Sequence, residues 1–464
     1  MVFSSMIFLC IFLPVTFGLH LLLPGMRAKN TLLVIASLLF YAYGEPVYVL
    51  LLIGSSFFNY LFAWLVERDP DHKKVWVVAA VLANLAVLII FKYTGFLISS
   101  FNSITGAAVP VPQIRMPIGI SFFTFQALSY VIDVYRGTTK AQKNFGKVLL
   151  YVSFFPQLIA GPIVKYHDIE VEVNTRTQTL EGTFTGIRRF AAGLCKKVLI
   201  ANTMGLVADN LFGAAASQIN ILGAWAGAIS YMLQIYFDFS GYSDMAIGLG
   251  WMFGFHFKEN FNYPYISSSI KEFWRRWHIS LSGWFKEYLY IPLGGNRKGR
   301  TRTVINKMIV FLATGIWHGA AINFLFWGVY HGLFLMLEEY VPAIVKKGGK
   351  VKGFFQHVYA LLVVCIGFVF FRAETMGQGV FWLKQMFTGF SFSASAVSLV
   401  LQQLTPVYLV TLVCAVIAAT PVNASLKKCR GYEVLVSLLS FAGLLLCILS
   451  LAGGTYNPFI YFRF

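Results

Sequence analysis

The sequence predicts an all-helical protein that crosses a membrane many times. Of its 464 residues, 58% are hydrophobic and only 12% are charged, a balance that a soluble domain of this size would not need. Apolar stretches follow one another along nearly the whole chain, and the basic residues gather in short polar loops between them. Together these three features indicate a polytopic membrane protein.

Thirteen apolar stretches carry the prediction. They run through residues 6–23, 31–44, 47–66, 75–99, 117–135, 148–164, 187–212, 221–250, 305–326, 327–345, 354–371, 406–424 and 434–452. Several are shorter than the ~20 residues that a full span needs, so some are expected to be re-entrant or interfacial, and roughly eleven to thirteen membrane helices or half-helices are expected. No polar stretch is long enough for a separate soluble domain, so residues 1–464 are predicted to form a single membrane domain.

The charge distribution sets the expected orientation. The formal net charge of +18 lies in loops between apolar stretches, which is the positive-inside pattern and not a nucleic-acid-binding surface. With these basic loops in the cytoplasm, the N-terminus and residues 453–464 both lie outside. The six cysteines have no metal-ligand spacing, and no metal site is predicted.

Residues 259–345 are predicted to be the catalytic core. They begin with ENFNYPYISSSIKEFWRRWHISLSGWFKEYLYIPLGGNRKGR and then turn apolar as MIVFLATGIWHGAAINFLFWGVYHG. His318 follows Trp317, about 11 residues after Lys307, which at the helical rise places it ~16 Å deep in the membrane. Ionisable groups at such depth are costly and are read first as functional.

His318 is predicted to be a general base that acts on a hydroxyl nucleophile. Its expected neighbours on one continuous helix leave room for a substrate: Thr314, Gly315, Ala321 and Ile322. The alternative is a core histidine that bonds to a neighbouring helix. For His331, in the next apolar stretch, the two alternatives are evenly balanced.

Two carboxylates interrupt the apolar stretch YFDFSGYSDMAIG. Asp238 and Asp244 are six residues apart, hence on different faces of a helix, which argues against a shared metal ion. They are interpreted either as structural partners of a buried Arg or Lys or as parts of a polar tunnel.

The cluster EFWRRWH mixes basic and aromatic side chains. Such spacing suits a helix in the headgroup layer, anchored by Trp274, Trp277 and Trp284. A sharper hypothesis, compatible with the first, is that this cytoplasmic face receives an anionic donor. The predicted donor-binding residues are Arg275, Arg276, Trp277 and Arg297.

These motifs resemble those of the membrane-bound O-acyltransferase family. The opening MVFSS, the ENFNYPYISSSIKEFWRRWHISLSGWFKEYLYIPLGGNRKG segment and GIWHG followed by YHG look like its bacterial branch that acetylates alginate and peptidoglycan. The resemblance covers nearly the whole chain. It implies a ring of helices around a central tunnel in the bacterial cytoplasmic membrane, surrounded by lipid.

The resemblance also implies an activity. The family's near-invariant membrane histidine falls on His318, and the second, less strictly required one on His278; Trp317 is expected to support the tunnel. Members take an acyl group from a cytosolic thioester, here acetyl-CoA, and deliver it to the outer face. An extracytoplasmic SGNH-type partner then passes it to a polysaccharide.

The tail GTYNPFIYFRF admits two interpretations. It is either an interfacial aromatic anchor or the acyl carrier, since related relays resemble it in ending with an aromatic motif around a tyrosine, which falls here on Tyr461. His318 would then deprotonate the phenol of Tyr461 for attack on the thioester.

Two other functions stay open at this level. One is transfer of D-alanyl or another acyl group to a wall polymer, although the related D-alanyl transfer proteins are typically shorter. The other is a transporter or flippase, with His318 as a proton relay and Asp238 and Asp244 as coupling sites. Transporters usually show an internal repeat, and none is visible.

Overall fold

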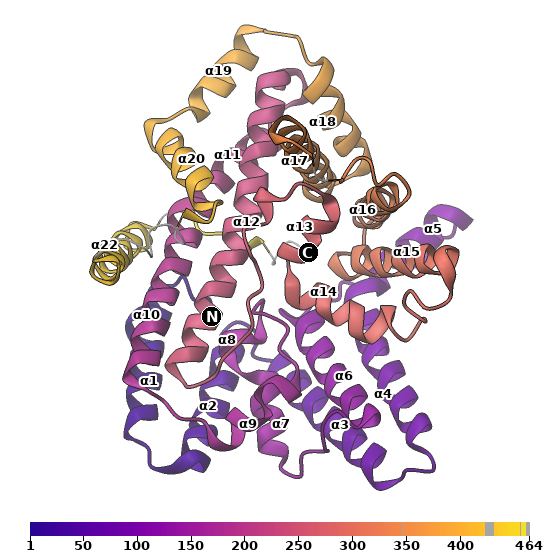
Figure 1. The fold of residues 1–464 in the computed structure, drawn as a ribbon, viewed down its shortest axis with the longest axis vertical. Helices are drawn as coiled ribbons and strands as arrows, with labels where there is room; N and C mark the ends of the chain where they lie inside the picture. Colours follow the sequence, from indigo (N-terminus) through magenta and orange to yellow (C-terminus); the bar gives the residue numbers. More distant parts are fainter. Residues whose placement is uncertain (347, 423–430, 455, 461–464) are drawn as a thin grey trace. The chain divides into compact units, whose positions relative to one another are not determined.

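Every regular element of the structure is a helix. The computed structural model describes residues 1–346, 348–422, 431–454 and 456–460, and no strand occurs among them (Figure 1). The predicted all-helical class is therefore confirmed. The chain divides into two compact units, Met1–Phe190 with Ser243–Lys258 and Ala191–Tyr242 with Glu259–Phe464. The single membrane domain over 1–464 stays a prediction.

The first unit is built around a buried helix, α6. Nearly all of α6 is buried, including charged Asp133, because α3 and α4 pack against it. The helices of this unit are α1 (Leu13–Leu22), α2 (Gly25–Ala42), α3 (Tyr48–Arg68), α4 (Lys73–Leu88), α5 (Thr94–Thr105), α6 (Ile120–Arg136), α7 (Phe145–Ser153), α8 (Phe155–Leu158), α9 (Tyr166–Thr175) and the first part of α10 (Leu180–Cys195), with π-helical turns η1 (Phe8–Phe12) and η2 (Ile89–Tyr93).

The second unit contains the segment predicted to be the catalytic core. Its long helices are α11 (Asn202–Phe212), α12 (Ile221–Met252, up to Tyr242), α15 (Gly299–His318), α16 (Ile322–Tyr340), α17 (Lys350–Arg372), α18 (Met376–Thr388), α19 (Ala394–Gln403), α20 (Pro406–Ala418) and α22 (Tyr432–Ala452). Shorter elements connect them: η3 (Lys196–Ala201), η4 (Ala216–Gln218), η5 (Pro264–Ile266), α13 (Ile270–Arg276), α14 (Ile279–Phe285) and η6 (Lys286–Tyr290).

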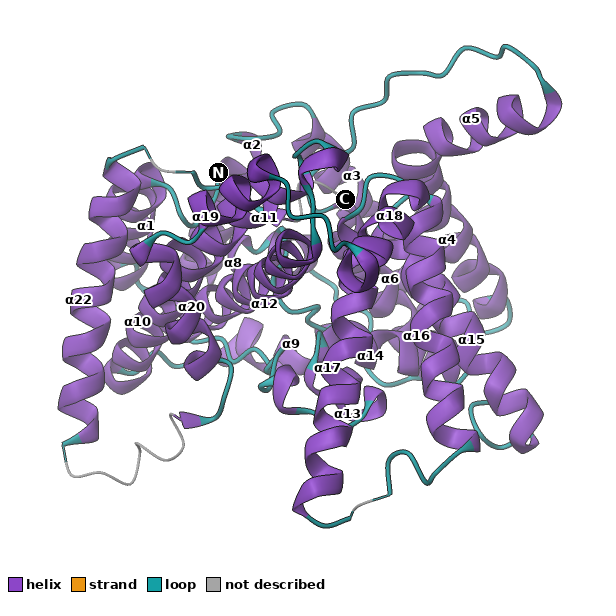
Figure 2. Ribbon diagram, turned by 90° about the horizontal axis from the view of Figure 1, so that it is seen from above, coloured by secondary structure: helices purple, strands orange, loops and turns teal. Residues whose placement is uncertain are grey.

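A close hairpin of α15 and α16 carries the central histidine (Figure 2). A Cβ at Gly315 would overlap the carbonyl oxygen of Phe324, and one at Gly328 would overlap that of Phe311, so these glycines let the two backbones touch. The hairpin corrects one expectation. α15 ends at His318, so Ala321 and Ile322 do not continue its helix, and the space beside Gly315 is filled by α16.

The close approach of α15 and α16 predicts that a larger residue at their contact lowers the stability of the fold. Gly315→Ala should lower the free energy of unfolding by about 1–3 kcal/mol, since the added methyl group meets backbone that cannot move away as a side chain would. Gly353→Ala on α17 is the matched control, because its position has nothing within 4 Å. Thermal unfolding in detergent would measure both; equal melting temperatures would contradict the packing interpretation.

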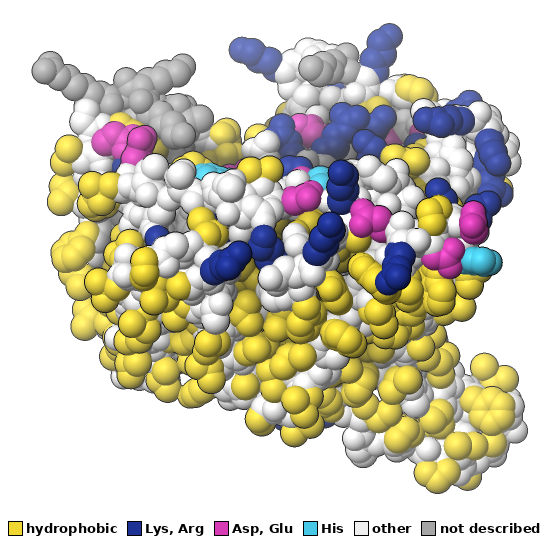
Figure 3. Space-filling model, turned by 90° about the horizontal axis from the view of Figure 1, so that it is seen from below, with side chains coloured by type: hydrophobic (Ala, Val, Ile, Leu, Met, Phe, Trp, Pro, Cys, Tyr) yellow, Lys and Arg dark blue, Asp and Glu magenta, His cyan; other side chains and the backbone are white. Residues whose placement is uncertain are grey.

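The outer surface of several helices is apolar. Within the described residues, five stretches are long and apolar enough to cross a membrane: Tyr48–Arg68, Lys73–Thr105, Leu180–Phe212, Lys350–Arg372 and Tyr432–Ala452. Ala394–Gln403 and Pro406–Ala418, bent by 65°, make a sixth if they count as one span. On the face drawn in Figure 3, hydrophobic and basic side chains gather in separate areas. The chain is a multi-pass membrane protein; the larger count of eleven to thirteen stays a prediction.

Candidate active site

His318 lies in an aromatic cage at the end of α15. Its ring centroid is 5.0 Å from that of Trp317, 5.1 Å from Trp327 and 5.1 Å from Phe371, all at steep interplanar angles. The side chain is almost fully buried. Because α15 ends there and α16 returns directly, the imidazole occupies a helix break and not the middle of a span. The rings packed around it restrict its orientation.

A small cavity borders the His318 ring. Its volume is about 10 Å3, which is room for one water-sized group. Its lining comes from four helices, the junction between α13 and α14, and the C-terminal segment: Ile235, Phe239, Trp277, His318, Trp327, Phe368, Phe371 and Ile460. An imidazole beside such a small space can exchange a proton with a compact reacting group.

His278 and His318 both pack on the ring of Trp317, with centroids 6.1 and 5.0 Å from it, and the backbone of His278 is strained. It adopts φ +43°, one of two positive values at non-glycine residues in the described chain, and breaks the helix between α13 and α14. Its Nδ1 lies 3.2 Å from Oδ1 of Asn260, an acceptor only, so Nδ1 carries the proton of that bond. The two imidazoles interact electrostatically. Backbone strain of this kind often marks functional sites.

The same break overturns the expectation of an interfacial helix with aromatic anchors. The three indoles are buried in the core of the second unit: Trp274, Trp277 and Trp284. α13 and α14 are seven residues each, and they turn their tryptophans inward. The spacing pattern was misread because the positive φ of His278 separates two helical faces that sequence periodicity joins.

A second, larger cavity lies in the same unit. Its volume is about 520 Å3, in the range of ligand sites. The walls are largely apolar, and the charged side chains of the lining are four basic and two acidic residues. Lining residues are Ser269, Lys271, Trp274, Arg275, Leu281, Ser282, Phe285, Lys286, Tyr290, Lys307, Val310, Phe311, Thr314, Leu335, Glu338, Glu339 and Val345. We call it the basic cavity.

One of the four predicted donor-binding residues, Arg275, lines the basic cavity. Arg276 instead pairs with Glu272 at 2.9 Å and donates to the carbonyl of Asn262. Burial raises the pKa of Glu272, but hydrogen bonds from Ser268 and Arg276 hold it below its ordinary value. Trp277 lines the His318 cavity, and the side chain of exposed Arg297 is in neither lining.

Two tryptophans lie between the cavities. Trp274 lines the basic cavity, Trp327 lines the His318 cavity, and their rings are 5.5 Å apart. Thr314 in one lining and His318 in the other are one turn apart on α15. His331 packs on both tryptophans, at 5.3 and 5.0 Å, and neither of its nitrogens has a hydrogen-bond partner among the described residues. The cavities are therefore neighbours across an aromatic wall.

Each carboxylate of the YFDFSGYSDMAIG stretch is paired with a cation. Within the second unit, Asp238 pairs with Lys197 at 2.8 Å. Within the first unit, Asp244 pairs with Arg189 at 2.6 Å. Asp238 and Asp244 therefore each have the cationic partner that their interpretation as structural residues predicts.

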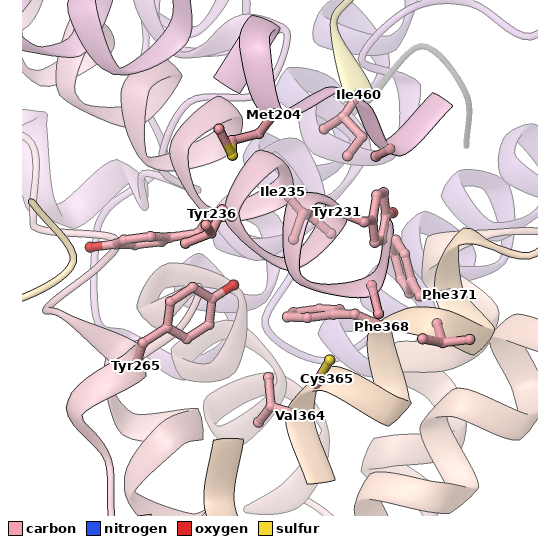
Figure 4. Close-up of a cluster of buried hydrophobic side chains, with 14 of the residues drawn as sticks. Met204, Tyr231, Ile235, Tyr236, Tyr265, Val364, Cys365, Phe368, Phe371 and Ile460 are labelled. Atoms are coloured by element: carbon pink, nitrogen blue, oxygen red, sulfur yellow. The ribbon is translucent and has the colours of Figure 1, made fainter. Parts of the chain in front are cut away.

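The C-terminal segment reaches the His318 cavity. Phe459 packs on Tyr242 with ring centroids 4.9 Å apart, and Ile460 lines the cavity. Figure 4 shows Ile460 in the buried cluster with Ile235 and Phe371. Tyr461 lies outside the described residues, so its carrier role is untested; the residue bonded to it is at the site.

Several site residues were missed from the sequence. Lys197 interrupts the apolar stretch 187–212, and a charge at that position is a signal that a buried partner exists. Phe368, Phe371 and Trp327 gave no signal, because aromatic residues in apolar helices are ordinary core residues. Their meeting around His318 depends on long-range packing.

Fold and site define a polytopic membrane protein with a buried histidine in the wall of the smaller of two neighbouring cavities. Residues 140–377 match the family model MBOAT, membrane-bound O-acyltransferase family. The probable alginate O-acetylase AlgI of Pseudomonas putida is 40% identical over 499 aligned residues, covering 100% of both chains. The peptidoglycan O-acetyltransferase of Helicobacter pylori is 37% identical over 421, covering 83% of this chain and 80% of that protein.

A more distant relative transfers another acyl group. The teichoic acid D-alanyltransferase of Bacillus subtilis is 27% identical over 329 residues, covering 67% of this chain and 81% of that protein. The chain belongs to the membrane-bound O-acyltransferase family. It is therefore an O-acyltransferase, and the transporter alternative is set aside.

Proposed function

We propose that this protein takes an acetyl group from cytosolic acetyl-CoA and relays it across the bacterial cytoplasmic membrane for O-acetylation of an envelope or exported polysaccharide. The observation that carries the proposal is the pair of neighbouring cavities, one basic and large and one small with His318 in its wall. Relatives named for alginate and peptidoglycan acetylation support the acetyl group and a polysaccharide acceptor.

The basic cavity suits a coenzyme A thioester. Arg275 and Lys286 can meet phosphates at its mouth, while Phe285, Phe311 and Leu335 surround an apolar arm. The basic loops that border it are those predicted to be cytoplasmic. A thioester in this cavity faces His318 across Trp274 and Trp327.

The proposed chemistry uses His318 as a proton carrier. It accepts the proton of the attacking hydroxyl, which we assign to Tyr461, while the oxygen attacks the thioester carbonyl. The C–O bond forms, the C–S bond breaks, and the proton passes to the leaving thiolate of coenzyme A. The aryl acetate then gives its acetyl group to a serine of an extracytoplasmic SGNH-type partner, which transfers it to polymer.

A direct experiment tests the proposal as a whole. Membranes containing the protein are supplied with radiolabelled acetyl-CoA, and wall and secreted polysaccharides of a deletion strain are examined by mass spectrometry. We expect labelled protein in the first assay and loss of polymer acetyl groups in the second. Label from a D-alanyl carrier and none from acetyl-CoA would instead place the protein with D-alanyl transfer.

Donor affinity provides a second prediction. Arg275→Gln and Lys286→Gln should each raise KM for acetyl-CoA about tenfold with little change in kcat, since a charged hydrogen bond to phosphate is lost at a partly exposed mouth. Arg302→Gln on α15 is the control, because this exposed arginine does not line the cavity. Unchanged donor titration curves for both cavity variants would leave these residues as topology signals only.

A further inference from the structure

A buried ion pair in the second unit holds the C-terminal segment. Lys197 of η3 and Asp238 of α12 are 2.8 Å apart, and their side chains are 3% and 2% exposed. Removing two charges from water costs more than their attraction returns unless further hydrogen bonds satisfy the groups. The contacts that each member makes beyond the pair are therefore informative.

The tail backbone supplies those further bonds. Lys197 Nζ donates to the carbonyl oxygen of Pro458 and, at 2.9 Å, to Oδ1 of Asn202. Asp238 Oδ2 accepts the backbone N–H of Ile460 at 2.7 Å. The ammonium of Lys197 thus binds the carbonyl of Pro458, and the carboxylate of Asp238 binds the N–H of Ile460, two residues further along the tail.

Side-chain contacts support the same segment upstream. Tyr456 donates its hydroxyl hydrogen to Asp209 of α11, which also pairs with Arg372 of α17 at 2.8 Å. Asn202 donates to Asn457 at 3.2 Å. Residues 456–460 are therefore hydrogen-bonded to η3, α11 and α12, and α17 contacts the tail's partner Asp209.

We propose that Lys197 and Asp238 are positioning residues that dock the C-terminal segment by its backbone at the His318 cavity. They place Ile460 in the cavity lining beside His318. The importance of this docking for transfer rests on the proposed carrier role of Tyr461. The docking itself does not, because it is carried by residues that the structure describes.

The polarity of the bonds provides a sharp test. In a K197D/D238K double variant the ion pair is kept, but a carboxylate faces the Pro458 carbonyl and an ammonium faces the Ile460 N–H. Both tail bonds turn repulsive while the attraction between η3 and α12 survives. A purely structural ion pair would tolerate this exchange, whereas a docking pair would not.

Docking can be measured without activity by photo-crosslinking. Benzoylphenylalanine in place of Phe459 is irradiated in membranes, and its crosslink to α12 near Tyr242 is mapped by mass spectrometry. We expect K197D/D238K to reduce the crosslink by about tenfold or more, because two charged hydrogen bonds are lost and loss of one alone has an effect of about tenfold. A K197M/D238N variant, with no charge left unpaired, should also reduce it and guards against misfolding of the exchange variant.

The matched control is the second ion pair. R189D/D244R exchanges the charges of another aspartate on the same helix α12 and should retain the crosslink. Retention of a full crosslink by both Lys197–Asp238 double variants would overturn the proposal.

The outcome is distinguishable from failure of the proposed function. Tyr461→Phe should keep the crosslink whether or not the carrier role holds, because it changes no residue of the docking contacts. If Tyr461→Phe retains acetylation and K197D/D238K still loses the crosslink, docking stands and the carrier role falls. If the crosslink is unaffected by K197D/D238K and K197M/D238N while Tyr461→Phe loses acetylation, the carrier role stands and the docking proposal falls.

Discussion

Replacing His318 by alanine should lower acetyl transfer by about 10²- to 10⁴-fold, the usual effect of removing a general base. The imidazole lies among the rings of Trp317, Trp327 and Phe371, and the adjoining cavity has room for only about one water-sized group, so no side chain or bulk water replaces the base. The measurement is transfer of label from acetyl-CoA by purified protein of equal amount.

Loss of packing must be separated from loss of the base. His318→Gln fills most of the cage but cannot accept a proton at neutral pH, so it should be as inactive as His318→Ala while being better packed. His256→Ala is a surface control, since that exposed ring pairs with Glu172 in the first unit. Near-normal transfer by well-folded His318→Gln would remove the histidine from the mechanism.

Composition and loop charge were sufficient to predict the class of fold. The reason is that a bilayer imposes one requirement along the whole chain, namely apolar helices with satisfied backbone bonds. The same logic singled out His318, because an imidazole in an apolar stretch is costly wherever the helices pack. Neither inference needs knowledge of which helices are neighbours.

Local helix breaks could not be predicted in the same way. α15 ends at His318, and Gly315 and Gly328 bring the facing backbones of α15 and α16 into contact. The positive φ of His278 separates α13, with Trp274, from α14, with Trp284. Periodicity assumes a continuous helix, so it assigned these tryptophans to the membrane interface.

Contacts between residues far apart in the sequence could not be predicted either. Asp238 was recognised as a carboxylate that needs a cation, but its partner Lys197 is 41 positions earlier (238 − 197), and the tail bonds of both lie more than 200 positions later. No sequence spacing encodes such meetings. The donor site shows the same limit, since only Arg275 of its four predicted members lines the basic cavity.

Replacing Tyr461 by phenylalanine should eliminate transfer to polymer. The substitution removes one oxygen and keeps the ring, so an anchor made of aromatic side chains would be unaffected. A phenol is protonated at neutral pH and needs a base to attack a thioester, and His318 lies at the cavity that Ile460 enters. An aryl ester is more activated than an alkyl ester, so acetyl-tyrosine can still acetylate a serine.

The carrier also predicts a trapped intermediate. Without its extracytoplasmic partner, the wild-type protein supplied with radiolabelled acetyl-CoA should accumulate label on the peptide that ends at Phe464, and Tyr461→Phe should accumulate none there. Phe459→Leu is the control, because it alters an aromatic residue of the same tail without removing a hydroxyl. Full polymer acetylation by Tyr461→Phe would show that the tail is an anchor and that the attacking hydroxyl belongs to another molecule.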